Sequence, residues 1–227
     1  MRMKAGRGSR QPRAKKSAYP KRRKKGTESG NNGLNTRKRV LKAAAELFAR
    51  RGYHATSVRQ LSSAVRLGRG ALYYHIKGKE RLLWDILWEP ARSLADKAVA
   101  LRSLDAPPDE KLRLFGRNLM RGIADDLAEW TVFFREFHGL SRQRLNEVLR
   151  LRETFEAVFR EILEAGYAQG QFRKPDPLLV KGLLGMFNYS YVWIRPHGSK
   201  TPEEIADEFC DAILQGIRVS PARSADT

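Results

Sequence analysis

Cysteine is nearly absent from this chain of 227 residues, where Cys210 is the only one. An internal disulfide is therefore excluded, and the low cysteine usage is typical of a reducing cytoplasm. No apolar run approaches the length of a membrane-spanning helix, and the N-terminus lacks the apolar core of a signal peptide. We therefore expect a cytoplasmic protein that does not engage a membrane.

Residues with catalytic or metal-binding chemistry are few and scattered. The four histidines, His54, His75, His138 and His197, lie far apart, and Glu136 beside His138 is an isolated pair. The sequence contains no zinc-ligand spacing, no Ser–His or Cys–His arrangement and no Gly-rich phosphate loop. We therefore expect no enzymatic activity, no metal and no cofactor.

Acidic residues are missing from one end of the chain. Residues 1–25 carry twelve Lys or Arg and no acid, and residues 36–80 carry eleven Lys or Arg against two acids. The total charge is +19, whereas residues 81–227 sum to −1. A basic charge confined to one end favours a polyanionic partner such as nucleic acid. The alternative, a generally basic solvated surface, is less favoured because the C-terminal part does not share it.

The apolar pattern divides the chain into a polar arm and a series of helices. Residues 1–35 contain almost no aliphatic side chains, which predicts a disordered basic arm that either contacts DNA phosphates or is only a solvated tail. Residues 219–227 are expected to form a disordered tail. Between them the apolar residues recur at helical spacing, and no stretch alternates as a strand would. The class is all-α, with helices expected at 36–51, 57–64, 68–75, 79–102, 109–125, 127–140, 141–169, 177–194 and 201–217.

Several helix ends are marked by residues that cap helices. Thr56 is the expected N-cap of the second helix, and Gly52 is the expected C-terminal stop of the first. Asp176 followed by a proline predicts the start of the eighth helix, and Thr201 with Glu204 forms a capping box for the ninth.

The stretch from Ser57 to Lys79 has the pattern of a helix-turn-helix. It predicts two short helices separated by a tight turn, and it contains no acid before Glu80. The second helix of such a motif lies in the DNA major groove, where cations and hydroxyls contact phosphates and base edges. We therefore expect this stretch to bind double-stranded DNA.

The same region resembles the DNA-binding domain of TetR-type transcriptional regulators. The matching segments are ELFARRGYHATSV, which ends the first helix, and GRGALYYHIKGKERLL. The resemblance implies a three-helix DNA-binding domain over 36–82 and a six-helix ligand-binding and dimerisation domain over 83–218. Arg66 and Gly68 depart from the usual turn Gly and the usual Ser or Thr cap, and Ile76 replaces a more usual Phe.

The resemblance also implies which side chains contact DNA. Arg69 to Ala71 would lie closest to base edges, and the other positions would hold phosphates. For Tyr73 the alternative is core packing, which we prefer for Leu72, and for His75 phosphate contact is favoured over metal binding. The expected contact residues are Thr56, Arg59, Arg69, Gly70, Ala71, Tyr73, Tyr74, His75, Lys77 and Lys79.

The C-terminal two thirds of the chain is rich in aromatic residues at helical spacing. Such an interior can line a cavity for an apolar ligand, and the alternative for each residue taken alone is an ordinary core. The resemblance implies a small-molecule pocket between these helices. The expected lining residues are Phe115, Trp130, Phe133, Phe134, Phe137, Phe155, Met186, Phe187, Tyr189 and Trp193.

The pattern Trp193-x-Arg195-Pro196-x-Gly198 is similar to the end of TetR-type repressors that answer acyl-CoA thioesters, including those governing fatty-acid and sterol-ring breakdown. The resemblance suggests an acyl-CoA thioester as the effector. Its phosphates would need cations, for which there are four candidates. These are Arg135, Arg142, Arg152 and Arg195.

The last two helices are expected to form a homodimer seam. Their apolar stripes and glycines allow close approach of a second copy, and two-fold symmetry would require a palindromic operator. The expected seam residues are Leu183, Phe187, Tyr191, Ile194, Ile205, Phe209 and Ile213.

We therefore expect a ligand-controlled transcriptional regulator, most simply a repressor released by its effector, with the helix 79–102 as the lever between its halves. The alternative is a non-specific architectural DNA-binding protein driven by the basic arm.

Overall fold

The computed structural model describes residues 28–195 and 197–218. Within these residues there are nine α-helices and two short 3₁₀ helices, and the expected all-α class is confirmed. In chain order these are α1 (Glu28–Arg51), α2 (Val58–Val65), α3 (Arg69–Ile76), α4 (Lys79–Ala100), α5 (Pro108–Asp125), α6 (Leu127–Glu136), η1 (Phe137–Gly139), α7 (Arg142–Ala168), α8 (Pro177–Asn188), η2 (Tyr189–Val192) and α9 (Pro202–Ile217).

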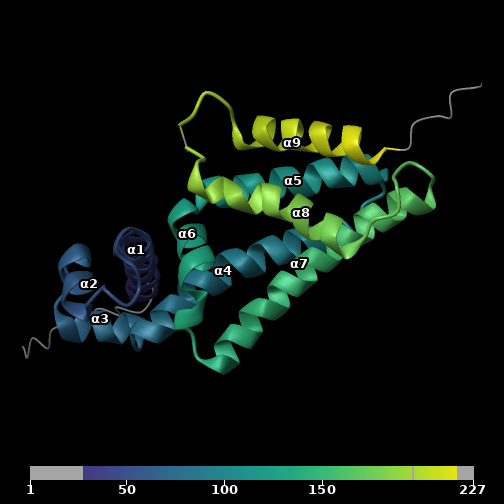
Figure 1. The fold of residues 1–227 in the computed structure, drawn as a ribbon. Helices are drawn as coiled ribbons and strands as arrows, with labels where there is room; N and C mark the ends of the chain where they lie inside the picture. Colours follow the sequence, from purple (N-terminus) through teal and green to yellow (C-terminus); the bar gives the residue numbers. More distant parts are fainter. Residues whose placement is uncertain (1–27, 196, 219–227) are drawn as a thin grey trace, which may run out of the picture.

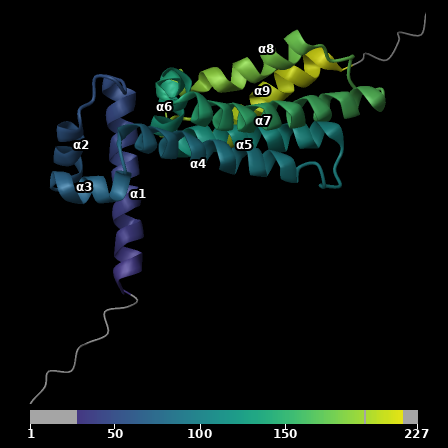
Figure 2. The same cartoon turned by 90° about the horizontal axis from the view of Figure 1, so that it is seen from below.

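The helices form two clusters joined by α4. Figures 1 and 2 show α1, α2 and α3 grouped at one end of the molecule, and α5 to α9 forming a longer bundle at the other. Helix α4 begins among the first three helices and then runs into the bundle, where it lies beside α7. Because α4 is one continuous helix, a displacement of its C-terminal part in the bundle would also move its N-terminal end in the first cluster.

The capping residues confirm three of the expected helix ends. Asp176 accepts a hydrogen bond from the Leu179 backbone N–H at 2.9 Å, and Thr201 forms the expected capping box with Glu204. Gly52 lies after α1 with φ +85°, a left-handed conformation that glycine adopts without steric cost.

Three boundaries differ by more than two residues from those expected. Helix α1 begins at Glu28, so residues 28–35 belong to a helix and not to the expected arm, whose remainder (1–27) lies outside the described residues, as does the tail 219–227. The sixth and eighth helices end earlier than expected, at Glu136 and Asn188, and each continues as a 3₁₀ turn. Apolar periodicity continues through these turns because Phe137 and Tyr191 still pack against the core, although Tyr189 and Val192 are exposed.

Helix α9 is held against α5 by a row of ion pairs. Arg113 pairs with Asp211 at 2.6 Å, Arg117 pairs with Asp207 at 2.8 Å, and Arg121 of the next turn pairs with a glutamate of α9. The arginines are spaced four residues apart, so they lie along one face of α5.

Cys210 lies buried beneath this row. Burial raises the pKa of its thiol to about 12, so the thiolate required for oxidation is scarce at neutral pH. No helix in the described ranges is both long enough and apolar enough to span a membrane.

Candidate nucleic-acid interface and apolar pocket

The corner between α1 and α2 is closed by Ser57 and not by Thr56. The Ser57 side chain accepts from the Gln60 backbone N–H, and the Gln60 side chain accepts from the Ser57 backbone N–H at 2.7 Å. Thr56 is fully buried, and its hydroxyl donates to the Gly52 carbonyl at 2.8 Å. The expected cap and the expected DNA contact at Thr56 are both wrong, because this hydroxyl is used inside the corner.

The turn between α2 and α3 contains a non-glycine residue in a left-handed conformation. Arg66 has φ 54° and ψ 42°, at the position where the sequence departs from the usual glycine. The turn is closed by the Leu67 N–H, which donates to the Ser62 carbonyl at 3.1 Å, and by the Ser62 hydroxyl. These bonds hold Arg66 in a left-handed conformation, which is unfavourable for a residue that has a side chain.

Helix α3 has one buried and one exposed face. Leu72 and Ile76 are buried in the core, as expected. Tyr74 on the opposite face is 81% exposed and Tyr73 is 41% exposed, so core packing is excluded for Tyr74 and incomplete for Tyr73. The remaining exposed residues of this face are Arg69, Gly70 and Ala71.

Cations flank the exposed face of α3. Arg59 on α2 and Lys77 at the end of α3 are exposed. Lys79 is partly withdrawn, because its Nζ donates to the His54 carbonyl at 3.4 Å and lies 4.3 Å from the Tyr53 ring centroid. Burial lowers the pKa of the Lys79 ammonium. The structure thus brings the expected contact residues together, with Thr56 excluded and Lys79 turned toward the α1–α2 corner.

A buried aspartate ties three helices of this region together. Asp85 of α4 accepts from Arg37 of α1 at 2.6 Å and from Arg81 at 3.1 Å. Arg37 also donates to the His75 carbonyl of α3 at 2.9 Å. The position of α3 is therefore coupled to α4 through one arginine and one carboxylate. Sequence reasoning missed this pair, whose only local signal is an acid on an otherwise apolar face of α4.

The first turn of α4 also contacts the start of α7. Glu80 accepts from the Ser141 backbone N–H at 3.1 Å and pairs with Arg144 at 2.6 Å. Partial burial acts to raise the pKa of the Glu80 carboxyl, but these two donors together hold it below its usual value. Nearby, the Tyr53 ring and Leu83 pack so closely on Gly139 that a Cβ there would lie 2.9–3.0 Å from them. The two clusters are thus in direct contact at the N-terminus of α7.

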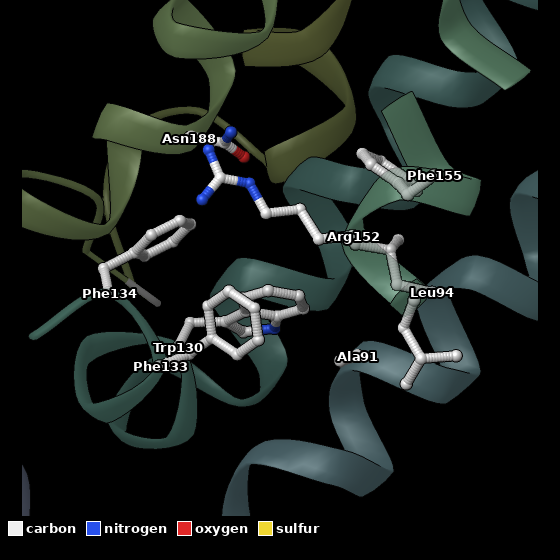
Figure 3. A pocket seen from close by; sticks show the side chains of 9 residues that line it. Ala91, Leu94, Trp130, Phe133, Phe134, Arg152, Phe155 and Asn188 are labelled. Carbon is white, nitrogen blue, oxygen red and sulfur yellow. The ribbon is translucent and has the colours of Figure 1, made fainter. Parts of the chain in front are cut away.

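An apolar pocket lies between α4, α6, α7 and the end of α8 (Figure 3). Its cavity volume is about 40 Å³, and the surrounding empty space, including open solvent, is about 390 Å³. Four of the expected aromatic residues line it, together with residues that sequence reasoning did not choose. The lining residues are Ala91, Leu94, Trp130, Phe133, Phe134, Leu151, Arg152, Phe155 and Asn188.

Six of the expected lining residues lie elsewhere. Phe115 and Phe187 are fully buried in the core, and Phe137 and Met186 are partly buried outside the lining. Tyr189 and Trp193 are 63% and 43% exposed on the surface. Helical spacing indicated that these residues share an apolar helix face. It could not indicate which neighbouring helix, if any, covers each side chain. Arg152 is the one expected cation that reaches the pocket.

The expected seam residues on α8 and α9 are divided between the core and the surface. Phe187, Ile194 and Ile213 are buried within their own subunit, so they are excluded from an intersubunit contact. The remaining seam residues, Leu183, Tyr191, Ile205 and Phe209, are partly exposed. The exposed apolar side chains on this side of the molecule are Leu178, Tyr189, Val192 and Trp193.

Within the described ranges there is no group of three His, Cys, Asp or Glu side chains that could hold a metal ion. The arrangement therefore offers two features: an exposed, acid-free helix flanked by cations, and an aromatic pocket connected to it by α4.

Known proteins share both halves of this architecture. The family described as bacterial regulatory proteins, tetR family, matches residues 40–86, and a tetracycline repressor-like C-terminal domain matches residues 105–217. The solved structure of the TetR family transcriptional regulator PfmR from Thermus thermophilus is 32% identical, with a TM-score of 0.73; the match covers 78% of this chain and 97% of that one.

Two further relatives are similar over most of their length. The transcriptional repressor KstR2 of Rhodococcus jostii is 27% identical over 83% of this chain and 93% of its own. The structure of AibR in complex with isovaleryl coenzyme A and operator DNA is 26% identical over 78% of this chain and 97% of that one, with a TM-score of 0.68. The chain therefore belongs to the TetR family of transcriptional regulators, which bind DNA and respond to ligands and are not enzymes.

Proposed function

We propose that this protein is a homodimeric repressor that binds a palindromic operator in the cytoplasm and is released from it by a small apolar effector. The observation that carries the DNA-binding half is the outer face of α3, on which Tyr74 is 81% exposed and no acid lies nearby in the sequence. Tyrosine is enriched at binding interfaces because its apolar ring and its hydroxyl can both contact a partner. The exposed Tyr74 is therefore suited to a contact with DNA.

The DNA contacts divide into two groups in this proposal. Arg69, Gly70 and Ala71 occupy the first turn of α3, the part of a recognition helix that approaches base edges. Phosphates are held by cations and hydroxyls on either side of this turn. These are Arg59, Tyr73, Tyr74, His75, Lys77 and Lys79.

The dimer forms through α8 and α9 in this proposal. Gly182 and Gly185 on α8 and Gly216 on α9 have open space where a Cβ would lie, which permits close approach of a second copy. Leu178 and Tyr189 lie on α8 and directly after it, four residues before Gly182 and four after Gly185, and both are highly exposed. Glycine flanked by exposed apolar side chains suits helix packing across a two-fold axis.

The effector binds in the aromatic pocket in this proposal, with an acyl-CoA thioester as the candidate class. Support comes from the pocket's apolar lining and from the similarity to AibR, whose complex contains isovaleryl coenzyme A. Ala91 and Leu94 line the pocket, and Asp85 on the same helix holds Arg37 and, through it, α3. An effector that displaces α4 would change the separation of the two α3 helices in the dimer.

A test of DNA binding uses fluorescence anisotropy with the full-length protein. The probe is a palindrome from the region upstream of its own coding sequence, and the control duplex has the same composition in shuffled order. We expect roughly 10³-fold or greater preference for the palindrome at moderate salt. Equal affinity for both duplexes contradicts the proposal.

Deleting residues 1–27 separates the regulator from the architectural alternative, which the twelve cations of residues 1–25 favour. A regulator keeps its sequence preference and shows a shallower salt dependence, because fewer phosphate contacts release fewer counterions. An architectural protein instead loses nearly all of its affinity.

A further inference from the structure

The polar groups of the aromatic pocket are nearly all hydrogen-bond donors. The pocket has one charged side chain, Arg152, and no Asp or Glu among its lining residues. The only other polar side chains are the indole of Trp130, which can only donate, and the amide of Asn188. A ligand that complements this lining has acceptor atoms and no cationic group.

Arg152 is a cation without a partner. In the part of the chain that the structure describes it makes no ion pair, hydrogen bond or ring contact, whereas Arg144 on the same helix pairs with Glu80. Figure 3 shows its guanidinium extended toward Asn188 on the side of the pocket opposite Ala91. Its side chain is exposed, so water solvates the guanidinium until a ligand in the pocket supplies an anion.

Trp130 adds a second unmatched donor. The residue is only 4% exposed, and its Nε1–H has no acceptor among the described residues. Buried indole N–H groups usually find a partner, so an unpaired one in the wall of a pocket indicates a place for a ligand oxygen. The rings of Phe133 and Phe134 lie 5.1 and 5.9 Å from the Trp130 ring, centroid to centroid, and form an apolar wall beside it.

We propose that the pocket binds an organic anion with an apolar body, in which the negative group pairs with Arg152 and a carbonyl or carboxylate oxygen accepts from Trp130. The cavity volume is only about 40 Å³, so a single ring or a short acyl chain enters where the pocket opens to solvent and only when lining side chains move apart. This inference rests on the proposed function, in that it takes this pocket as the effector site. Two sources share the chemistry: a free carboxylic acid, and an acyl thioester whose anionic charge lies on its phosphates.

Binding of matched probe pairs to the full-length protein, measured by calorimetry without DNA, tests the charge preference. The pairs are phenylacetate with phenylacetamide, cyclohexanecarboxylate with its amide, and octanoate with octanamide. We expect at least one acid to bind about tenfold more tightly than its amide. In Arg152→Gln this preference disappears, and Arg152→Lys restores part of it. The matched control, Arg150→Gln, removes an exposed arginine of the same helix outside the pocket and keeps the preference.

The two sources are separated by adding phenylacetyl-CoA, octanoyl-CoA and CoA alone. A thioester that binds at least about tenfold more tightly than its free acid, with a loss in Arg152→Gln, assigns the anion to the CoA phosphates. If the free acid binds as tightly as its thioester or more tightly, the anion that pairs with Arg152 is the carboxylate. Equal binding of acids and amides together with Arg152-independent binding of the thioesters overturns the inference, as does the absence of binding by every acid and thioester.

Operator release, measured separately with the same probes, distinguishes the inference from the proposed function. If an acid binds through Arg152 but leaves operator affinity unchanged, the anion site stands and control from this pocket fails. If neutral amides release the operator as well as acids do, regulation from this pocket is supported and the preference for an anion is refuted.

Discussion

Arginine and lysine serve different purposes in the two halves of this molecule. In the α5–α9 half, arginines such as Arg113 and Arg117 face carboxylates across a helix contact. Among the cations of residues 36–80, only Arg37 forms a direct ion pair with a carboxylate in the described part of the chain. Paired cations position helices, whereas unpaired cations on one surface create a field that attracts a polyanion. The balance between cations and nearby acids, and not the number of cations, distinguishes a binding surface from a packing contact.

The largest expected effect comes from removing two exposed side chains of α3 that have no carboxylate partner. Replacing Arg69 and Tyr74 together by alanine is expected to weaken operator binding about 100-fold, because each contact to a base edge or phosphate contributes roughly 1–3 kcal/mol. Both side chains are exposed, so the melting temperature should not change. Anisotropy titration and thermal unfolding measure the two quantities. The control pair Arg160→Ala and Tyr167→Ala, on the exposed surface of α7, should leave both unchanged.

The second effect concerns Asp85, the buried carboxylate that pairs with Arg37 and Arg81 in the DNA-binding half. Asp85→Ala is expected to lower the free energy of unfolding by about 2 kcal/mol, because it leaves Arg37 and Arg81 without their buried carboxylate. Operator affinity should fall as well, since Arg37 also holds the C-terminal carbonyl of α3. Urea unfolding gives the first quantity.

Asp96→Ala is the matched control for Asp85→Ala. Asp96 lies on the same helix and pairs with Arg92 at 3.7 Å, but both side chains are more than half exposed. We expect a change of about 0.5 kcal/mol or less. Equal losses in the two variants would show that burial of Asp85 is unimportant.

The third effect is a gain in stability at the turn between α2 and α3. Arg66→Gly removes a side chain from a left-handed conformation and is expected to raise the free energy of unfolding by about 0.5–1 kcal/mol. Arg59→Gly, the same substitution inside α2, is expected to lower it by about 1 kcal/mol because glycine weakens a helix interior. Chemical unfolding of both variants should therefore give opposite signs, and a loss at both positions would refute the strain at Arg66.

The smallest effect lies in the paired cations of the α5–α9 contact. A double-mutant cycle with Arg117→Ala and Asp207→Ala is expected to give a coupling energy of about 0.5 kcal/mol, because both side chains remain partly exposed. The coupling should shrink at high salt, where exposed charges are screened. A coupling energy larger than the stability loss in Asp85→Ala would contradict the distinction between buried and surface pairs.

Much of the DNA-binding surface could be predicted from the sequence because its signals are local. Exposed tyrosines next to buried Leu72 and Ile76 follow from helical spacing alone, and an acid-free stretch is visible in any linear reading. Thr56 is the exception. A threonine before a helix suits both a cap and a buried corner, and only the path of the chain at Gly52 determines which one forms.

The pocket and the contacts between the two halves were harder to predict because they depend on residues far apart in the chain. Arg37 and Asp85 are 48 residues apart, and Glu80 and Ser141 are 61 apart. Periodicity assigns Phe187 and Trp130 equally to an apolar face, but Phe187 packs beneath α9 while Trp130 borders a cavity.

The sequence by itself determined the all-α class, the helix-turn-helix and the separation of charge between the two ends, because propensity, capping and charge act over a few residues. Tertiary structure alone decided which aromatic residues border the cavity, which cations are paired and how α4 connects the two halves. Each of these depends on which side chains from distant segments fill the same space, and the local pattern of a helix does not specify its neighbours.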